Sequence, residues 1–82
     1  MTLAEIKRLV EKEFKIDTSE IEAEYNCVCF RSWDWRLYCD RDGEEDDDYP
    51  NFVGCELVEK LVGPDCEVRD VEKNWFTVSL NK

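Results

Sequence analysis

The sequence predicts an α+β domain, a two-layer sandwich in which two helices cover one face of a four-stranded antiparallel sheet, in the order α-β-β-α-β-β. Two observations lead to this fold class. Apolar residues recur at helical spacing in two segments, and each segment is followed by two stretches in which apolar and polar residues alternate with the period of a strand. The 82 residues are enough for one domain, 1–82, with a single hydrophobic core.

The first helix is expected over residues 3–15. Thr2 followed by Glu5 is a capping-box pattern, in which each side chain satisfies a free backbone amide at the start of a helix. Apolar residues then recur at helical spacing at Leu3, Ile6, Leu9, Val10 and Phe14. We expect the helix to end before Asp17-Thr18-Ser19.

A hairpin is expected next, with strands over residues 20–29 and 33–40. In the first strand, Glu20, Glu22 and Glu24 alternate with apolar residues. In the second strand, Trp33 and Trp35 share a face, and we assign that face to the core. The sheet face opposite the helices is expected to carry Val28 and the aromatic residues Phe30, Tyr38 and Trp75. Aromatic side chains with a rim of charge are typical of protein interfaces.

The second half repeats this order. Pro50 suits the first turn of a helix, and Gly63-Pro64 is a strong stop signal. Strands are expected over residues 66–71 and 75–80. The tetrapeptide Leu-Val-Glu-Lys occurs at 9–12 and again at 57–60, each time in a helix before a hairpin, so a duplicated αββ unit is one hypothesis.

The most unusual feature of the chain is an acidic run, residues 40–48. It holds seven carboxylates and one arginine, and thus −6 of the formal net charge of −10. Such a block cannot be buried, so we expect it in a loop, residues 40–49. A dedicated calcium loop is excluded, because Tyr49 stands where an EF-hand needs its bidentate glutamate. A solvated loop without a specific role and weak divalent binding both stay open.

A third interpretation is that the acidic run imitates a nucleic-acid backbone. Nine extended residues span at most about 30 Å, so six net charges lie roughly 5 Å apart, against about 3.4 Å in a DNA strand. Glu20, Glu22 and Glu24 form a second row, although they also fit the solvent face of a strand. The candidate partner-binding residues are these three glutamates, Tyr38 and Trp75 on the sheet, and the acids Asp40, Asp42, Glu44, Glu45, Asp46, Asp47 and Asp48.

Composition argues against several other functions. Chains this acidic do not bind nucleic acids or anionic membranes through their bulk surface. No apolar run approaches the roughly 20 residues of a membrane span, and no signal peptide is visible, so we expect a cytoplasmic protein. The chain has no histidine, the commonest general base, and no phosphate-binding or nucleophile motif, so we expect no enzyme activity.

The cysteines give no strong sign of a metal or cofactor. Five are present, at positions 27, 29, 39, 55 and 66, and an odd number makes a poor disulfide framework. Structural zinc sites usually show closely spaced ligand pairs in two places, and this chain has only Cys27-x-Cys29. We therefore expect buried thiols, no metal and no cofactor, although a redox role stays open.

In size, acidity and lack of catalytic motifs, the chain is similar to phage-encoded inhibitors of bacterial defence, including anti-restriction and anti-CRISPR proteins. The similarity is one of composition over the whole chain and implies no residue roles. It implies a small inhibitor whose acids engage the basic groove of a nucleic-acid-binding protein. The alternative is a structural or assembly module, a homodimer for example, that self-associates through its sheet face and keeps the acidic run for solubility.

Overall fold

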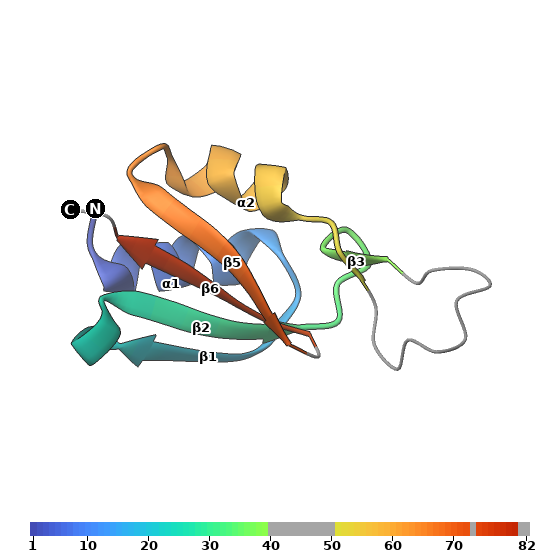
Figure 1. Ribbon diagram of the computed structural model, residues 1–82, viewed down its shortest axis with the longest axis horizontal. Coiled ribbons are helices and arrows are strands. Elements are labelled where there is room, and N and C mark those ends of the chain that lie inside the picture. Colours follow the sequence, from blue (N-terminus) through green and yellow to red (C-terminus); the bar gives the residue numbers. More distant parts are fainter. Residues whose placement is uncertain (40–50, 73, 81–82) are drawn as a thin grey trace.

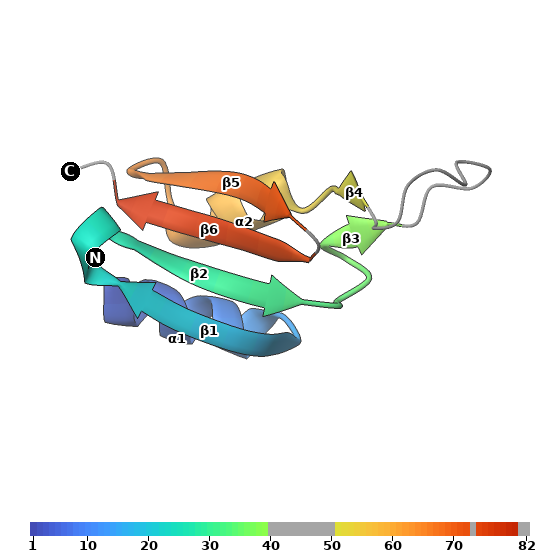
Figure 2. The ribbon, with the colours of Figure 1, turned by 60° about the horizontal axis from the view of Figure 1, so that its bottom comes forward.

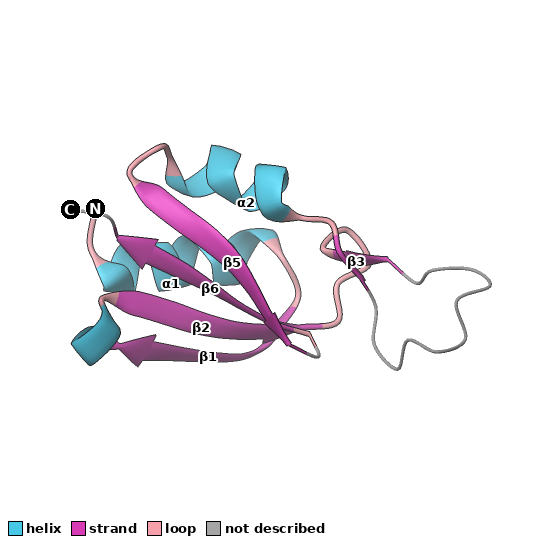
Figure 3. Ribbon diagram, viewed as in Figure 1, coloured by secondary structure: helices cyan, strands magenta, loops and turns pink. Residues whose placement is uncertain are grey.

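In the computed structural model, two helices pack on one face of a four-stranded antiparallel sheet, which confirms the predicted α+β fold (Figures 1 and 2). The structure describes residues 1–39, 51–72 and 74–80, and of 39, 51 and 72 only the backbone. The strand order is β1-β2-β6-β5 (Figure 3), and β3 and β4 form a separate two-stranded ribbon (Figure 2). The elements are α1 (Leu3–Glu13), β1 (Ile16–Glu22), the 3₁₀ turn η1 (Ala23–Tyr25), β2 (Cys27–Ser32), β3 (Tyr38–Cys39), β4 (Asn51–Phe52), α2 (Cys55–Val62), β5 (Cys66–Glu72) and β6 (Trp75–Leu80).

Helix α1 begins with the predicted capping box. The Thr2 amide donates to Glu5 Oε1 at 2.8 Å, and the Glu5 amide donates to Thr2 Oγ1 at 3.2 Å. Ile6 and Val10 are fully buried against the sheet. The helix ends two residues earlier than predicted, because Phe14 is already extended and turns its ring into the core.

The first hairpin differs from the prediction. Its strands are β1 and β2, so the turn falls inside the segment that was predicted as one strand, 20–29. Asn26 closes this turn in the left-handed conformation, with φ of 57°, and donates from Nδ2 to the Leu80 carbonyl at 3.0 Å. The turn was not predicted because η1 is short, so the alternation of polar and apolar residues continues across it.

The two faces of β2 are also exchanged relative to the prediction. Val28 and Phe30 are fully buried beneath the helices, and the Phe30 ring stacks on Phe76 at 5.2 Å between ring centres. Cys27 and Cys29 therefore lie on the opposite face of the sheet. A shift of one residue in a strand turns every side chain to the other face, and such a shift explains why the faces of β2 were predicted wrongly.

Residues 33–37 form a turn, not the predicted strand, and only Tyr38 and Cys39 pair as β3. Trp33 and Trp35, which were assigned to the core, are 58% and 80% exposed. We call residues 33–37 the tryptophan turn. Tyr38, predicted on the open sheet face, is instead a core residue with 6% exposure.

Helix α2 begins five residues after Pro50 and ends as predicted at Val62, before Gly63, whose φ is 95°. Gly54 is the N-cap residue of this helix and not an interior residue, so it does not destabilise the helix as a glycine in its middle would. Its backbone instead lies directly against Leu37, in a gap that leaves no room for a side chain.

The second hairpin, β5 and β6, agrees with the prediction within one residue, and Asn74 turns it with φ of 69°. The central strands β2 and β6 pair so that Val28 lies opposite Val78 and Phe30 opposite Phe76. Each half of the fold is thus one helix followed by one hairpin, and the repeated tetrapeptide lies in α1 and in α2. A duplicated origin of the two halves stays a hypothesis.

Candidate functional site

The acids of the acidic run, residues 40–48, lie outside the described residues, but the chain on either side of them is described. Tyr38 pairs with Phe52 and Cys39 with Asn51, so β3 and β4 bracket the run. The Tyr38 and Phe52 rings lie 5.2 Å apart, and Phe52 stacks in turn on Phe76 at 5.2 Å. The described residues on either side of the acidic run are therefore fixed to the hydrophobic core.

Tyr38 cannot contribute to a surface in this arrangement. Its ring lies in the core, and its hydroxyl has no hydrogen-bond partner among the described residues. Burial raises the pKa of Tyr38, and the nearby charge of Asp70 raises it further, so the hydroxyl stays neutral. The structure gives Tyr38 the role of anchoring β3.

One face of the sheet points away from both helices (Figure 2). Glu20 and Glu22 lie on this uncovered face, because their partners in β2 alternate with the buried Val28 and Phe30. Their backbone partners are Cys29 and Cys27, so two carboxylates flank two thiols on the same face. Glu24 does not continue the row, because it lies in η1. Glu67 lies on the same face at the far edge, two strands from Cys27. Its position was not predicted, because the alternation of residues does not show which strands are neighbours.

The four thiols whose side chains are described are free. Cys27 and Cys66 are buried, as expected, whereas Cys29 and Cys55 are half-buried. Burial raises the pKa of Cys29 to about 11, with further contributions from Cys27, Glu22 and Glu20, so this thiol is protonated at neutral pH. Across residues 1–39, 51–72 and 74–80, no group of three or more Cys, Asp or Glu side chains is arranged to hold a metal ion.

A buried carboxylate fixes the tryptophan turn. Asp34 is 5% exposed and accepts hydrogen bonds from the backbone amides of Lys15 and Arg36, both at 2.9 Å. The Arg36 guanidinium adds two bonds, at 3.0 and 3.2 Å, and lies 4.8 Å from the centre of the Phe14 ring. These contacts, led by the guanidinium, lower the pKa of Asp34 to about 2.

The same network joins three segments that are distant in sequence. Ser32 Oγ donates to the Lys15 carbonyl at 2.6 Å and accepts from the Asp34 amide at 3.0 Å. Asn74 Nδ2 donates to the Ser32 carbonyl at 3.0 Å. Because the junction of α1 with β1, the end of β2 and the β5–β6 turn are all tied together, the tryptophan turn starts from a rigid base.

Trp33 and Trp35 are presented outward by this turn, at the end of the sheet from which β3 leads into the acidic run. The guanidinium carbon of Arg31 lies 5.7 Å from the centre of the Trp33 ring, within range of a cation–π contact. Arg31 also pairs with Trp75, which lies half-buried on the uncovered face as predicted. The exposure of the two tryptophans was not predicted, although the charged residues that alternate with them, Asp34 and Arg36, could have indicated it.

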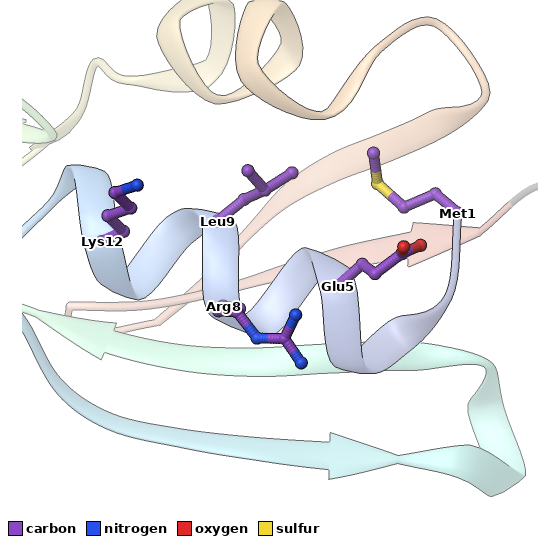
Figure 4. A pocket seen from close by; sticks show the side chains of 5 residues that line it. All are labelled: Met1, Glu5, Arg8, Leu9 and Lys12. Atoms are coloured by element: carbon purple, nitrogen blue, oxygen red, sulfur yellow. The ribbon is translucent and has the colours of Figure 1, made fainter.

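Among the described residues, a shallow pocket of about 300 Å³ lies along α1. It is lined by Met1, Glu5, Arg8, Leu9 and Lys12, and Arg8 extends from the opposite side of the helix to Leu9 (Figure 4). Because its charged groups do not converge on one point, the pocket offers no arrangement for acid–base or nucleophilic chemistry.

No family model, curated protein or solved structure matches the chain. Within the described ranges, neither helix has the length and apolar character that crossing a membrane requires.

Proposed function

We propose that this protein is a small, non-enzymatic, cytoplasmic inhibitor that occupies the basic nucleic-acid-binding surface of a partner protein, in the manner of phage anti-defence proteins. One observation carries the proposal. Residues 40–48 hold −6 of the net charge of −10, and the chain on either side of them is paired and packed into the core. A rigid attachment lowers the entropy that the chain loses when it binds.

Long-range electrostatics supports the same function. A basic groove that binds phosphates attracts a polyanion over about 10 Å at 0.1 M salt, which accelerates association. Glu20 and Glu22 extend the negative charge onto the uncovered sheet face, whereas Glu67 is paired with Arg69 at 3.2 Å. Binding through these groups should weaken steeply as salt concentration rises, as phosphate contacts do.

The test is capture of a partner from a lysate of the native host at low and moderate salt, with identification by mass spectrometry. A variant with its acids replaced by the matching amides at Asp42, Glu44, Glu45, Asp46, Asp47 and Asp48 should lose the partner or bind it without the salt dependence. A nucleic-acid ligand of the partner should compete with the wild-type chain.

The matched control removes charge from the other side of the molecule. Glu56→Gln and Glu59→Gln alter exposed acids of α2, away from the uncovered face, and should leave binding almost unchanged. If neutralising the acidic run leaves both affinity and salt dependence as they are in the wild type, the proposed function is wrong.

A second candidate function, self-association through the sheet, is favoured by the uncovered face. Cys29, Thr77 and Trp75 are half-buried there, each beside a charged residue of the neighbouring strand, and no described element covers them. Sedimentation equilibrium separates the two functions. A dimer that depends on concentration, persists when the acidic run is neutralised and dissociates in Thr77→Lys would favour an assembly module.

A further inference from the structure

The exposure of Trp33 and Trp35 is the feature that the proposed function leaves unused. Two of the three tryptophans of the chain are 58% and 80% exposed. Exposing this apolar surface to water is unfavourable and adds nothing to the stability of the isolated domain. Exposed tryptophans on a well-ordered segment are typical anchors of protein interfaces. The two tryptophans are held in place by two buried neighbours, Asp34 between them and Leu37 after them.

The turn holds the rings without help from a partner. The Leu37 and Tyr38 amides donate to the Asp34 carbonyl at 3.0 and 3.1 Å, and the Asp34 carboxylate holds the Arg36 amide. The Arg31 guanidinium lies over Trp33 at 5.7 Å, so one face of that ring is occupied and steadied. Preorganised rings of this kind lose little entropy on binding.

The combination of a polyanion with exposed planar rings distinguishes between two kinds of nucleic acid. A duplex keeps its bases stacked inside, and its binding proteins contact phosphates and base edges. A surface that imitates a duplex needs carboxylates alone. A single strand offers phosphates and free base planes, and its binding proteins stack those planes on aromatic side chains.

From this, and resting on the proposed function, we infer that the partner is a protein that binds single-stranded nucleic acid. Trp33 and Trp35 stack on its aromatic platforms in place of two bases, while the carboxylates of the chain meet the cations that would hold the phosphates. Trp33 stacks through the face that Arg31 leaves open. The tryptophan turn is thus the part of the surface that selects the partner, and charge supplies the attraction.

The test uses the partner captured by the wild-type chain, purified, with an oligothymidylate and a duplex of equal length as competitors. The oligothymidylate should displace the protein at concentrations at which the duplex does not. Trp33→Ala and Trp35→Ala should each weaken binding about tenfold, the loss expected for one stacked base. Both side chains are exposed, so thermal unfolding should confirm that the variants stay folded.

Conservative variants separate stacking from ordinary apolar burial. Trp33→Phe and Trp35→Phe keep a planar ring and should bind almost as the wild type does, whereas Trp33→Leu and Trp35→Leu should be as weak as the alanine variants. Tyr25→Ala is the matched control, because Tyr25 is 70% exposed and lies in η1, at the other end of β2.

The two possible failures are distinct. Equal competition by the duplex, or wild-type affinity in the leucine variants, overturns this inference but leaves the proposed function intact, provided that neutralising the acidic run abolishes binding. If the neutralised chain binds as the wild type does, or if no partner is captured, the proposed function fails and this inference fails with it.

Discussion

At the scale of single residues, Asp34 determines the path of the chain after the first hairpin. Its carboxylate accepts from the amide of Lys15, nineteen positions earlier, and from the Arg36 amide and guanidinium. These bonds hold the chain in a turn, although the alternation of residues 33–40 is that of a strand. Where a buried carboxylate competes with a strand pattern, its hydrogen bonds prevail because an unpaired buried charge costs several kcal/mol.

The first prediction concerns acid stability. The pKa of Asp34 is about 2 in the folded protein and near 3.9 when unfolded, so its contribution, about 2 kcal/mol, is complete above pH 4 and is lost as pH falls through 2. Urea unfolding of wild type and Asp34→Asn should therefore differ most at neutral pH. The difference should shrink between pH 4 and pH 2. A difference that stays constant over this range contradicts the assignment, and Glu24→Gln, at an exposed site in η1, serves as the control.

The second prediction concerns Gly54. A Cβ at this position would collide with Leu37 Cδ2 and lie 3.0 Å from Leu37 Cα. We expect Gly54→Ala to lower the free energy of unfolding by about 1–3 kcal/mol, the usual cost of an overpacked core. In a double-mutant cycle with Leu37→Ala, the combined loss should be smaller than the sum of the two single losses, because alanine removes Cδ2, although it keeps the Cα that lies 3.0 Å away. Additive losses would mean that the contact is not the cause.

At the scale of elements, the molecule shows which sequence signals suffice. The capping box of α1, the glycine after α2 and the second hairpin were all predicted, because each depends on neighbours within a few residues. The turn at Asn26 was not predicted, because its side-chain partner is the Leu80 carbonyl, 54 positions away. The placement of Glu24 and the face of Val28 followed from that one error.

The third prediction tests this turn. Asn26→Gly keeps the left-handed conformation and loses only the side-chain hydrogen bond to the Leu80 carbonyl, so we expect a loss of about 1 kcal/mol. Asn26→Ala adds the steric cost of a Cβ at positive φ and should lose about 2 kcal/mol. Urea unfolding of the two variants measures the difference. A glycine variant as unstable as the alanine variant would show that backbone conformation is not the limiting factor.

At the scale of the whole molecule, net charge is a liability for folding. A formal charge of −10 on 82 residues repels itself, and salt screens this repulsion. The fourth prediction is that Tm rises as NaCl increases from about 0.01 to about 0.1 M, where the Debye length falls from about 30 to about 10 Å. The variant with six neutralised acids, whose formal net charge falls from −10 to −4, should show a smaller rise. An equal rise in both chains would assign the repulsion to other charges.

The sequence by itself determined the fold class, the end of α2, the second hairpin and the concentration of charge in residues 40–48. These properties depend on composition and on short-range patterns, which survive small errors in register. The tertiary structure alone decided which face of β2 is buried, where the first hairpin turns and that Trp33 and Trp35 are exposed. A period of two is unchanged when a strand shifts by one residue, so only contacts between distant segments, such as that of Asp34 with Lys15, select one of the two faces.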